Sequence, residues 1–441
     1  MNARLKSHLF LFGAAVSLMI PAVFNGYPLV YSDTATYLDS GFTLEMPFDR
    51  PLTYGLFLRI SSLNGLTLWT VIGLQCLLLA YLIFRLVREI LTESRTWYFY
   101  GFVIVLSLSL LTGISWTASQ LMPDIFTPIM FLTAILLITG RLSRREQLFL
   151  YLLFFLSAAM HLSHIAFNVA FLTTVLIARE VKLLKLKSVL KISPMIILLT
   201  LSLATIFITG SALSKSRHIF LMAAFVEHGI VKQYLDENCA TKDYKLCAYK
   251  DSLPEFAWQF LWVESGPLQK MGGRKETKQE FNQIIKATFT SPRFIAIHIR
   301  ESLKATASQL VRFNIGDGNG SFPEGTKLHE RMGLFVPHEL NAYETSRQNQ
   351  SSLVNLPWII RLHQVVVAAS LLSLVLLFAK TRKVPPDHLF TAICTMVLLG
   401  ILINAWTCGT FANAIDRLGT KIIWFIPLLA VLSLNLIRKL H

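Results

Sequence analysis

Hydrophobic residues occur along this chain in long runs separated by short basic clusters, and the run from Leu148 to Ala178 is the most informative. It is almost wholly apolar except near its middle, where His161 and His164 stand. A single helix of this length would measure about 45 Å, more than the roughly 30 Å hydrocarbon core of a bilayer. We therefore predict two short helices joined by a turn that carries both histidines.

Basic clusters flank this run on both sides and support its division into a hairpin. They are Arg141, Arg144 and Arg145 before the run, and Arg179, Lys182, Lys185, Lys187 and Lys191 after it. Such clusters mark the cytoplasmic side of a membrane. Both ends of the run are therefore predicted inside, with the histidines at or below the outer membrane face, where polar groups are costly and usually functional.

Eight further apolar runs are long enough to cross a membrane. They are Leu9–Phe24, Leu66–Leu86, Trp97–Thr112, Ile125–Gly140, Ile192–Gly210, Trp358–Ala379, Leu389–Ala405 and Ile422–Ile437. With the histidine hairpin they predict an all-α polytopic membrane protein of about ten transmembrane helices. Both termini are expected on the inside of a cytoplasmic (inner) membrane, because basic residues lie near each: Arg4 and Lys6 at one terminus, and Arg438 and Lys439 at the other.

The polar segments between these runs predict three parts. Residues 1–210 form an N-terminal transmembrane module whose first outer loop covers residues 25–63. Residues 211–356 are long enough for a domain, which we expect to be α-rich, outside (periplasmic) and inserted before the last three spans. Residues 357–441 form a C-terminal transmembrane module.

Composition supports the membrane class. Hydrophobic residues make up 54% of the chain and charged residues 15%, which is far more apolar than a soluble globular protein. The formal net charge of +15 would suit a nucleic-acid partner. Because much of the lysine and arginine lies beside apolar runs, as membrane orientation requires, we expect membrane lipid and no nucleic acid as partner.

Two of the five cysteines lie close together in the predicted outer segment. Cys239 and Cys247 would close a short local loop in an oxidising compartment, so a disulfide between them is possible. The other three cysteines have no evident partner, and none of the spacings is that of a zinc site.

The first outer loop carries the most suggestive chemistry. Ser32 can cap a short helix in which Asp33 and Tyr37 share a face, so that a carboxylate and a phenol project together above the membrane. A carboxylate there suits a general base or a metal ligand. The structural alternative is that Asp33 is an acid of the first helical turn, favoured by the helix dipole.

This loop also carries a resemblance to a known family. Asp33 begins an Asp-x-x-x-Tyr-Leu stretch, Arg50 begins an Arg-Pro-Leu-x-Tyr-Gly-x-x-Leu stretch, and Asp124 follows Met-Pro at the outer end of the fourth span. These features resemble the C-type (GT-C) integral-membrane glycosyltransferases, the class of the protein O-mannosyltransferases and the lipid A aminoarabinose transferase. The resemblance covers roughly residues 1–180, and beyond residue 191 it rests on architecture alone.

The resemblance implies a sugar donor carried on a polyprenyl phosphate or pyrophosphate, with Asp33 deprotonating the acceptor. It also implies that a second acidic site, at Asp124, faces the first, although helix capping would equally explain an acid there. The chain lacks an obvious Asp-x-Asp pair, and at Asp33 its first loop has a single acid where some relatives carry two adjacent ones. Whether a divalent cation serves as cofactor therefore stays open.

Two arginines and two histidines complete the candidate site. Arg50 and Arg417 are the outer cations nearest the spans and could stabilise a departing phosphate, while Asp416 with Arg417 could instead form an interfacial ion pair. His161 and His164 could bind phosphate, relay a proton or supply metal ligands, or could be a hydrogen-bonded pair that ties two spans together.

The sequence therefore favours a membrane glycosyltransferase that moves a sugar from a polyprenyl-phosphate donor to an acceptor on the outer face. The first alternative is a transporter or flippase of a lipid-linked saccharide, which would use the histidines and acids as a path. The second is a membrane acyltransferase with a buried histidine as base. The candidate acids gather on one predicted face, which favours an outward-facing enzyme over a transporter.

Overall fold

The computed structural model describes residues 3–91, 94, 96–181, 186–353, 356–380 and 387–438. These residues form helices and connecting turns, and in this part of the chain the sole strand-like contact is an isolated parallel bridge between Leu29 and Gln120. Of the basic residues used above to predict orientation, Lys182, Lys185 and Lys439 lie outside the described residues.

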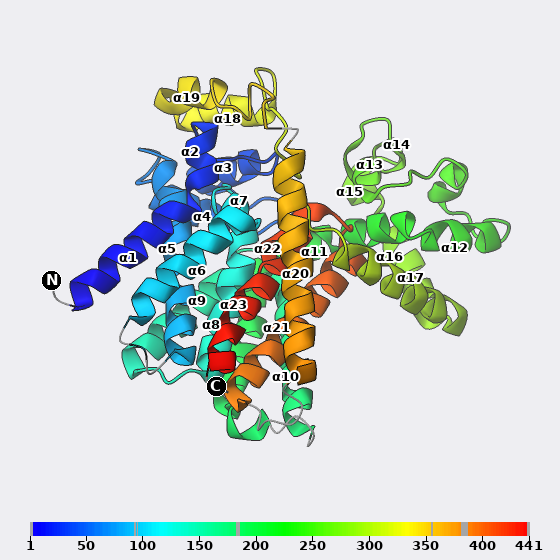
Figure 1. Cartoon of the computed structure of the whole chain (residues 1–441). Coiled ribbons are helices and arrows are strands. Elements are labelled where there is room, and N and C mark those ends of the chain that lie inside the picture. The colour runs from blue at the N-terminus through cyan, green and yellow to red at the C-terminus, as the bar shows by residue number, and fades with distance from the viewer. Residues whose placement is uncertain are drawn as a thin grey trace.

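A bundle of long helices forms the body of the molecule (Figure 1). Its members are α1 (Ala3–Leu18), α5 (Trp69–Ile90), α6 (Trp97–Leu111), α8 (Phe126–Thr139), α9 (Arg144–Ala159), α10 (Ser163–Glu180), α11 (Ile192–Glu227), α20 (Pro357–Lys380), α21 (His388–Phe411), α22 (Asp416–Ile423) and α23 (Phe425–Arg438). Most buried apolar side chains of these helices belong to one continuous core, whereas those at the end of α11 belong to a second one.

Five segments of the described chain are long and apolar enough to cross a membrane. They are Trp69–Ile90, Ile192–Gly210, Pro357–Ala379, His388–Phe411 and Asp416–Leu434, and three shorter apolar helices cover Leu5–Leu18, Trp97–Leu111 and Pro123–Thr139. The fold is therefore all-helical and compatible with a membrane protein of several spans, as the sequence predicts.

The histidine run is divided into two helices, α9 and α10, with the break at Met160–Leu162. Its middle lies beside the start of α8, where His164 Nε2 is 2.9 Å from Thr127 Oγ1. Its two ends lie beside the opposite end of α8: Lys191 Nζ donates to the carbonyl of Gly140. The predicted division into two helices is confirmed, and both ends of the run return to the same end of the bundle; that each helix crosses a membrane stays a prediction.

That end of the bundle, here called the basic end, is held by buried ion pairs. Arg85 lies 3.0 Å from Glu89 and 3.1 Å from Glu146 at the start of α9, and Glu89 accepts the backbone N–H of Arg141. The opposite end, where the histidines lie, is called the site end. Helix α8 separates the two ends by 14 residues, about 20 Å.

Two helices differ from the predicted spans. The first run is broken at Met19 into α1 and the short α2 (Ile20–Asn25), which has a proline in its first turn. Helix α11 does not end at Gly210 but continues to Glu227, because neither a proline nor a left-handed residue interrupts it there.

The first loop folds into a helical pair, α3 (Thr34–Thr43) and α4 (Thr53–Ser61). The two helices meet at Gly41 and Gly55, where a Cβ on either glycine would run into the other backbone. The structure places Asp33 rather than Ser32 at the N-cap position of α3, without a side-chain capping bond. The loop is thus a compact two-helix layer at the site end.

The large segment 211–356 folds as two bodies rather than as one (Figure 1). The first, here called the lateral domain, has its own core between Ile219 and Ile297. It comprises the end of α11, then α12 (Ile230–Asn238), α13 (Ala257–Trp262), α14 (Pro267–Lys270), α15 (Gly273–Glu276), α16 (Lys278–Thr290) and α17 (Pro292–Leu310). The second comprises α18 (Lys327–Phe335) and α19 (Leu340–Glu344), whose buried side chains join the core of the bundle.

Helices α18 and α19 lie over the first loop and are fastened to it. Arg331 lies 3.0 Å from Asp39, and the rings of Phe42 and Phe335 stack with centroids 4.9 Å apart. Further along, Gln348 forms hydrogen bonds to both the N–H and the carbonyl of Val30. These contacts fix the segment that precedes Asp33.

Cys239 and Cys247 are joined by a disulfide in the lateral domain. We expect the double substitution Cys239→Ser/Cys247→Ser to lower the stability of this domain by about 2–3 kcal/mol, since a short closed loop restricts the unfolded chain. Limited proteolysis with and without reductant measures the effect. The wild type should become sensitive on reduction and the double variant should not respond; equal resistance of both proteins under all conditions would contradict the prediction.

Candidate functional site

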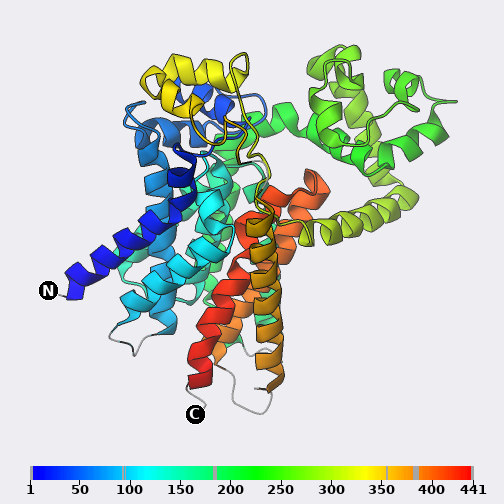
Figure 2. The ribbon, with the colours of Figure 1, turned by 45° about the horizontal axis from the view of Figure 1, so that its top comes forward.

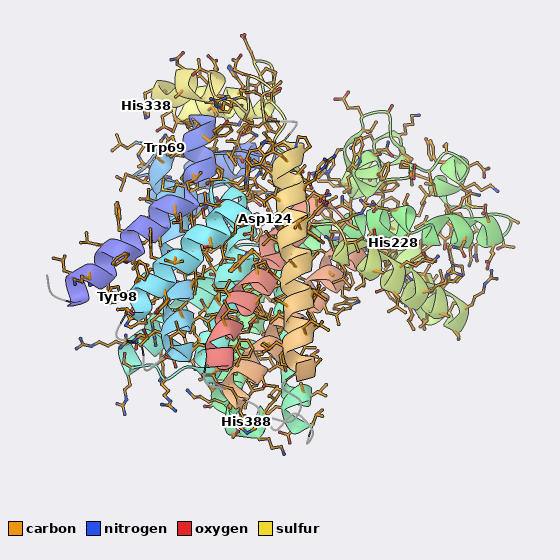
Figure 3. All side chains as sticks on the ribbon, in the orientation of Figure 1. Trp69, Tyr98, Asp124, His228, His338 and His388 are labelled. Atoms are coloured by element: carbon orange, nitrogen blue, oxygen red, sulfur yellow. A yellow bond between two sulfur atoms is a disulfide. The ribbon has the colours of Figure 1, made fainter. Side chains whose placement is uncertain are left out.

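A buried acid lies at the start of α8, at the site end of the bundle (Figure 3). Asp124 belongs to a single 3₁₀ turn, Pro123–Ile125, and its side chain is 6% exposed. One carboxylate oxygen is 2.6 Å from Arg417 Nη1 and the other is 3.3 Å from Lys421 Nζ. Asp124 is therefore the anion of a buried charge triad, and the α8 helix has Ile125, not Asp124, at its N-cap.

Both cations come from α22. Arg417 and Lys421 are four residues apart, so they project from the same face of this helix, toward Asp124. The Arg417 guanidinium also lies over the Tyr31 ring, 4.2 Å from its centroid. Asp416 points elsewhere: its carboxylate accepts hydrogen bonds from the backbone and side chain of Asn314. Asp416 thus fastens a loop, while Arg417 belongs to the charge cluster.

The first loop supplies a second group of charges. Arg50 Nη1 lies 3.1 Å from Asp33, and the same guanidinium makes a two-pronged contact with Asp49 at 2.7 and 3.1 Å. The Arg50 guanidinium also lies over the Tyr37 ring, 5.3 Å from its centroid. Arg50 is therefore shared between two carboxylates from opposite ends of the loop.

Tyr37 does not project beside Asp33 as the sequence predicts. Its ring is 1% exposed and packs edge-on against Tyr54 at a centroid distance of 4.8 Å. Burial raises the pKa of the Tyr37 hydroxyl, and burial also raises that of Tyr31 against the opposing charge of Arg417. Both tyrosines therefore remain neutral at physiological pH, which excludes them as general bases.

The two histidines have different surroundings. His164 is 2% exposed, and its ring nitrogens contact Thr127 Oγ1 at 2.9 Å and the carbonyl of Ser157 at 2.8 Å. These contacts tie the hairpin to α8, which is the structural alternative considered from the sequence. His161 is partly exposed and interacts electrostatically with Lys421, Asp124 and Arg50. His164 interacts electrostatically with Lys421 and Asp124 as well, but of the two histidines His161 is the more exposed.

These contacts link the triad and the first loop into one cluster. Arg417 interacts electrostatically with Asp33 as well as with Asp124, and Tyr37 with Arg50 as well as with Arg417. The structure thus brings together Asp33, Tyr37, Arg50, Asp124, His161 and Arg417 from segments far apart in the sequence. It directs His164 and Asp416 to structural contacts at the edge of this cluster.

The two acids differ in their exposure and in the number of cations that contact them. The Asp124 side chain is 6% exposed and has two cationic partners, whereas that of Asp33 is 32% exposed and has one. An acid that deprotonates a substrate must reach it and must be able to accept a proton. Asp33 is the more accessible of the two acids, whereas both oxygens of Asp124 are held by Arg417 and Lys421.

A cavity of about 30 Å³ adjoins Arg417 and has room for about one water molecule. It is lined mainly by polar groups, from Trp116, Thr117, Gln120, Asn314, Ile315, Gly316, Asp317, Asn319, Arg417 and Thr420. Gly318, in the same glycine-rich turn, has a φ of +82° and lies so close to Tyr31 that a Cβ would overlap the ring. This turn therefore packs against the Tyr31 ring of the cluster, and position 318 requires glycine.

Sequence reasoning missed three members of the cluster: Tyr31, Asp317 and Lys421. Asp317 accepts the backbone N–H of Arg417 at 3.1 Å, across a separation of 100 residues. Lys421 could have been found from the sequence, because a lysine near the start of an apolar span needs an anionic partner. Nothing in the local sequence distinguishes Tyr31 or Asp317.

The described residues contain no group of three or more His, Cys, Asp or Glu side chains that could hold a metal ion. The most buried acid, Asp124, is already paired with two cations. Hard divalent cations bind through several oxygen ligands. Among the described residues, the charge cluster therefore presents no ready-made set of oxygen ligands for such a cation.

Comparison with known proteins finds no matching family model, no similar curated protein and no similar solved structure.

Removing the charge of Asp124 should destabilise the protein. In Asp124→Asn, two buried cations lose their counter-ion, which we expect to cost about 3–5 kcal/mol. Thermal unfolding of the purified protein in detergent measures this as a lower midpoint. Asp33→Asn, at a more exposed position, should change the midpoint little. Adding Lys421→Gln to Asp124→Asn should recover part of the loss, and an unchanged midpoint in Asp124→Asn alone would refute the triad's structural role.

Proposed function

We propose that the protein is an integral-membrane glycosyltransferase of the GT-C class. It would transfer a sugar from a polyprenyl-phosphate or pyrophosphate donor to an acceptor on the outer face of the cytoplasmic membrane. The observation that carries this proposal is the meeting of Asp33 and Arg50 with the Asp124, Arg417 and Lys421 triad at one end of an apolar helical bundle. An accessible acid beside several cations suits group transfer from a phosphate leaving group.

The chemistry assigns separate roles to the two acids. Asp33 takes the proton of the acceptor group as this attacks the anomeric carbon of the sugar. The bond between that carbon and the phosphate oxygen breaks, and the polyprenyl phosphate leaves with the electron pair. Arg50 and Arg417 stabilise the negative charge on the phosphate, and Asp124 holds Arg417 and Lys421 in position.

The distribution of ionisable groups favours an enzyme over a flippase or transporter. Charged residues gather at the site end and at the basic end, and α8, which runs between them, carries none. A proton or anion path through the membrane would need polar groups along this depth. The acyltransferase alternative needs a histidine free to act as base: both ring nitrogens of His164 are engaged, which leaves His161 as its candidate.

The same proposal includes about ten spans: the five long segments, the three shorter apolar helices, and α9 and α10. Arg85, Arg141, Arg144 and Arg179 at the basic end put that end in the cytoplasm by the positive-inside rule. The site end, the lateral domain and α18–α19 would then lie outside, in the periplasm.

This orientation can be tested with single cysteines. Arg144→Cys and Lys187→Cys, both exposed at the basic end, should not react with an impermeant thiol reagent added to intact cells. Lys270→Cys, exposed in the lateral domain, should react. All three should react after the membrane is opened, which controls for accessibility. Reaction at Arg144→Cys but not at Lys187→Cys would mean that the histidine run crosses the membrane once.

The catalytic role of Asp33 has a well-matched control. Asp33 and Asp39 both belong to the α3 region, both are 32% exposed, and each lies within 3.1 Å of an arginine. Asp33→Asn keeps the size of the side chain but removes the proton acceptor. We expect it to lower turnover by about 10²-fold or more, the usual scale for a general base. Asp39→Asn should retain wild-type turnover.

The measurement is the transfer of radiolabelled sugar from a panel of polyprenyl-phosphate donors to membrane acceptors by purified variants. Asp49→Asn, which also removes a partner of Arg50, separates the loss of a base from the loss of arginine positioning. Wild-type turnover in Asp33→Asn would remove the base assignment. Donor translocation without any transfer product in the wild type would identify a flippase instead.

A further inference from the structure

Helix α17 has an apolar stripe that faces away from the protein. Ile295, Ile299 and Leu303 recur at four-residue spacing and are 39%, 58% and 66% exposed. The opposite face of the helix is buried, with Phe294 and Ile297 in the core of the lateral domain. Three consecutive large apolar side chains on one exposed helix face mark an interaction surface.

Contacts between α17 and the end of the apolar span α21 indicate where this stripe lies relative to a membrane. Its second half is attached to the end of the apolar span α21: Trp406 Nε1 donates to Ser302 Oγ at 3.1 Å, and Ser302 lies 2.8 Å from Thr410. Ala305 packs so closely on Gly409 that a Cβ at Gly409 would meet its carbonyl. The helix therefore leaves the bundle at the level where a membrane span ends.

The orientation of α17 also fits a helix that lies along the membrane surface. Figure 2 shows α17 running across the direction of α20 and away from the bundle. In Figure 1, the domain's α13 and α14 lie on the far side of α12 and α16 from α17. An amphipathic helix whose second half meets the end of a span and which runs across that span would lie in the plane of the membrane surface.

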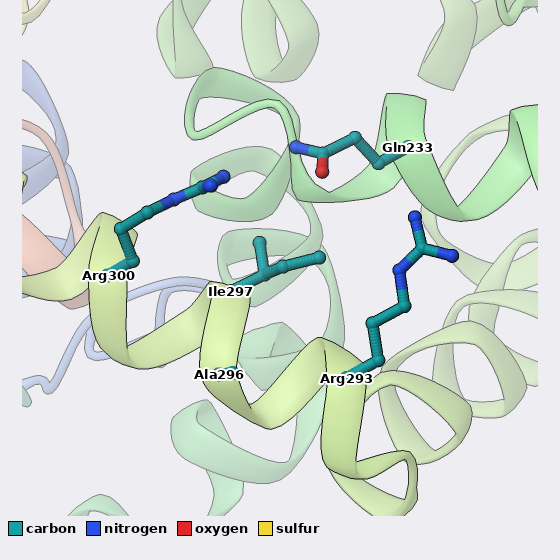
Figure 4. A pocket seen from close by; sticks show the side chains of 5 residues that line it. All are labelled: Gln233, Arg293, Ala296, Ile297 and Arg300. Atoms are coloured by element: carbon teal, nitrogen blue, oxygen red, sulfur yellow. The ribbon is translucent and has the colours of Figure 1, made fainter.

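A basic hollow borders the stripe. It has a volume of about 400 Å³ and is lined by Gln233, Arg293, Ala296, Ile297 and Arg300 (Figure 4). The two arginines flank Ile297 on α17, and Gln233 faces them from α12. Lys304, one turn beyond Arg300, extends the same basic edge. Apolar side chains beside a basic edge match the acyl chains and phosphate of an anionic phospholipid.

We propose that α17 is an interfacial helix that docks the lateral domain on an anionic lipid surface. Ile295, Ile299 and Leu303 enter the boundary between headgroups and acyl chains, and the phosphate of one phospholipid occupies the hollow between Arg293 and Arg300. The arginines now contact Glu237 and Glu301 at 2.7 Å. The Arg293 and Arg300 side chains are themselves 67% and 57% exposed, so the guanidinium N–H groups that do not contact these carboxylates are open to a phosphate.

The stripe is tested by fluorescence in the full-length protein in lipid nanodiscs. An environment-sensitive dye is attached to Ile299→Cys or Leu303→Cys, and to Lys270→Cys on α14 as the control. The dye at the two stripe positions should be quenched by lipids carrying a shallow quencher and protected from aqueous iodide. The dye at Lys270→Cys should be quenched by iodide and not by the lipid-borne quencher. Equal quenching by iodide at all three positions would overturn the proposal.

The hollow is tested by titrating fluorescent phosphatidylglycerol into the detergent-solubilised full-length protein. Arg293→Gln/Arg300→Gln should weaken binding about 25-fold, since each of the two basic side chains near an anionic headgroup contributes about a factor of five. Lys286→Gln, an exposed charge on the neighbouring α16, should leave binding unchanged. Equal binding by the double variant, or displacement of the lipid by inorganic phosphate, would overturn the lipid assignment. Neither test depends on sugar transfer.

Discussion

The buried charge triad of Asp124, Arg417 and Lys421 is the interaction on which the site end depends. Moving two cations into an apolar helical core costs several kcal/mol each unless an anion compensates them. Asp124 compensates both at once, because its two oxygens contact different partners. This pairing fixes α22 against the start of α8. It thereby determines where the last span begins and where Arg417 meets the first loop.

Around this triad, further hydrogen bonds position the remaining parts. Asp416 holds Asn314, and Gln309 exchanges hydrogen bonds with the backbone of Ile415. The glycine-rich turn that packs on Tyr31 directly follows Asn314 in the chain. A rigid frame of this kind leaves Asp33 as the accessible acid of the cluster, since its partner Arg50 is held on the other side by Asp49.

The helical hairpin could be predicted because two independent signals agreed, namely a run too long for one span and basic clusters at both of its ends. The lateral domain could not be delimited in the same way. Its first helix is the continuation of α11, and no breaker marks the change from span to domain at Gly210. Likewise, Leu328 and Met332 join the bundle core rather than that domain, which depends on long-range packing.

The candidate site was predictable where its residues are close in sequence and less so where they are distant. Asp33 and Arg50 share one loop, whereas Asp124 and Lys421 are 297 residues apart. Even so, the membrane makes distant charges informative. A lysine four residues after an arginine, at the start of an apolar span, requires an anion at the same depth. Asp124 also begins an apolar helix, so burial cost alone identifies it as the candidate partner.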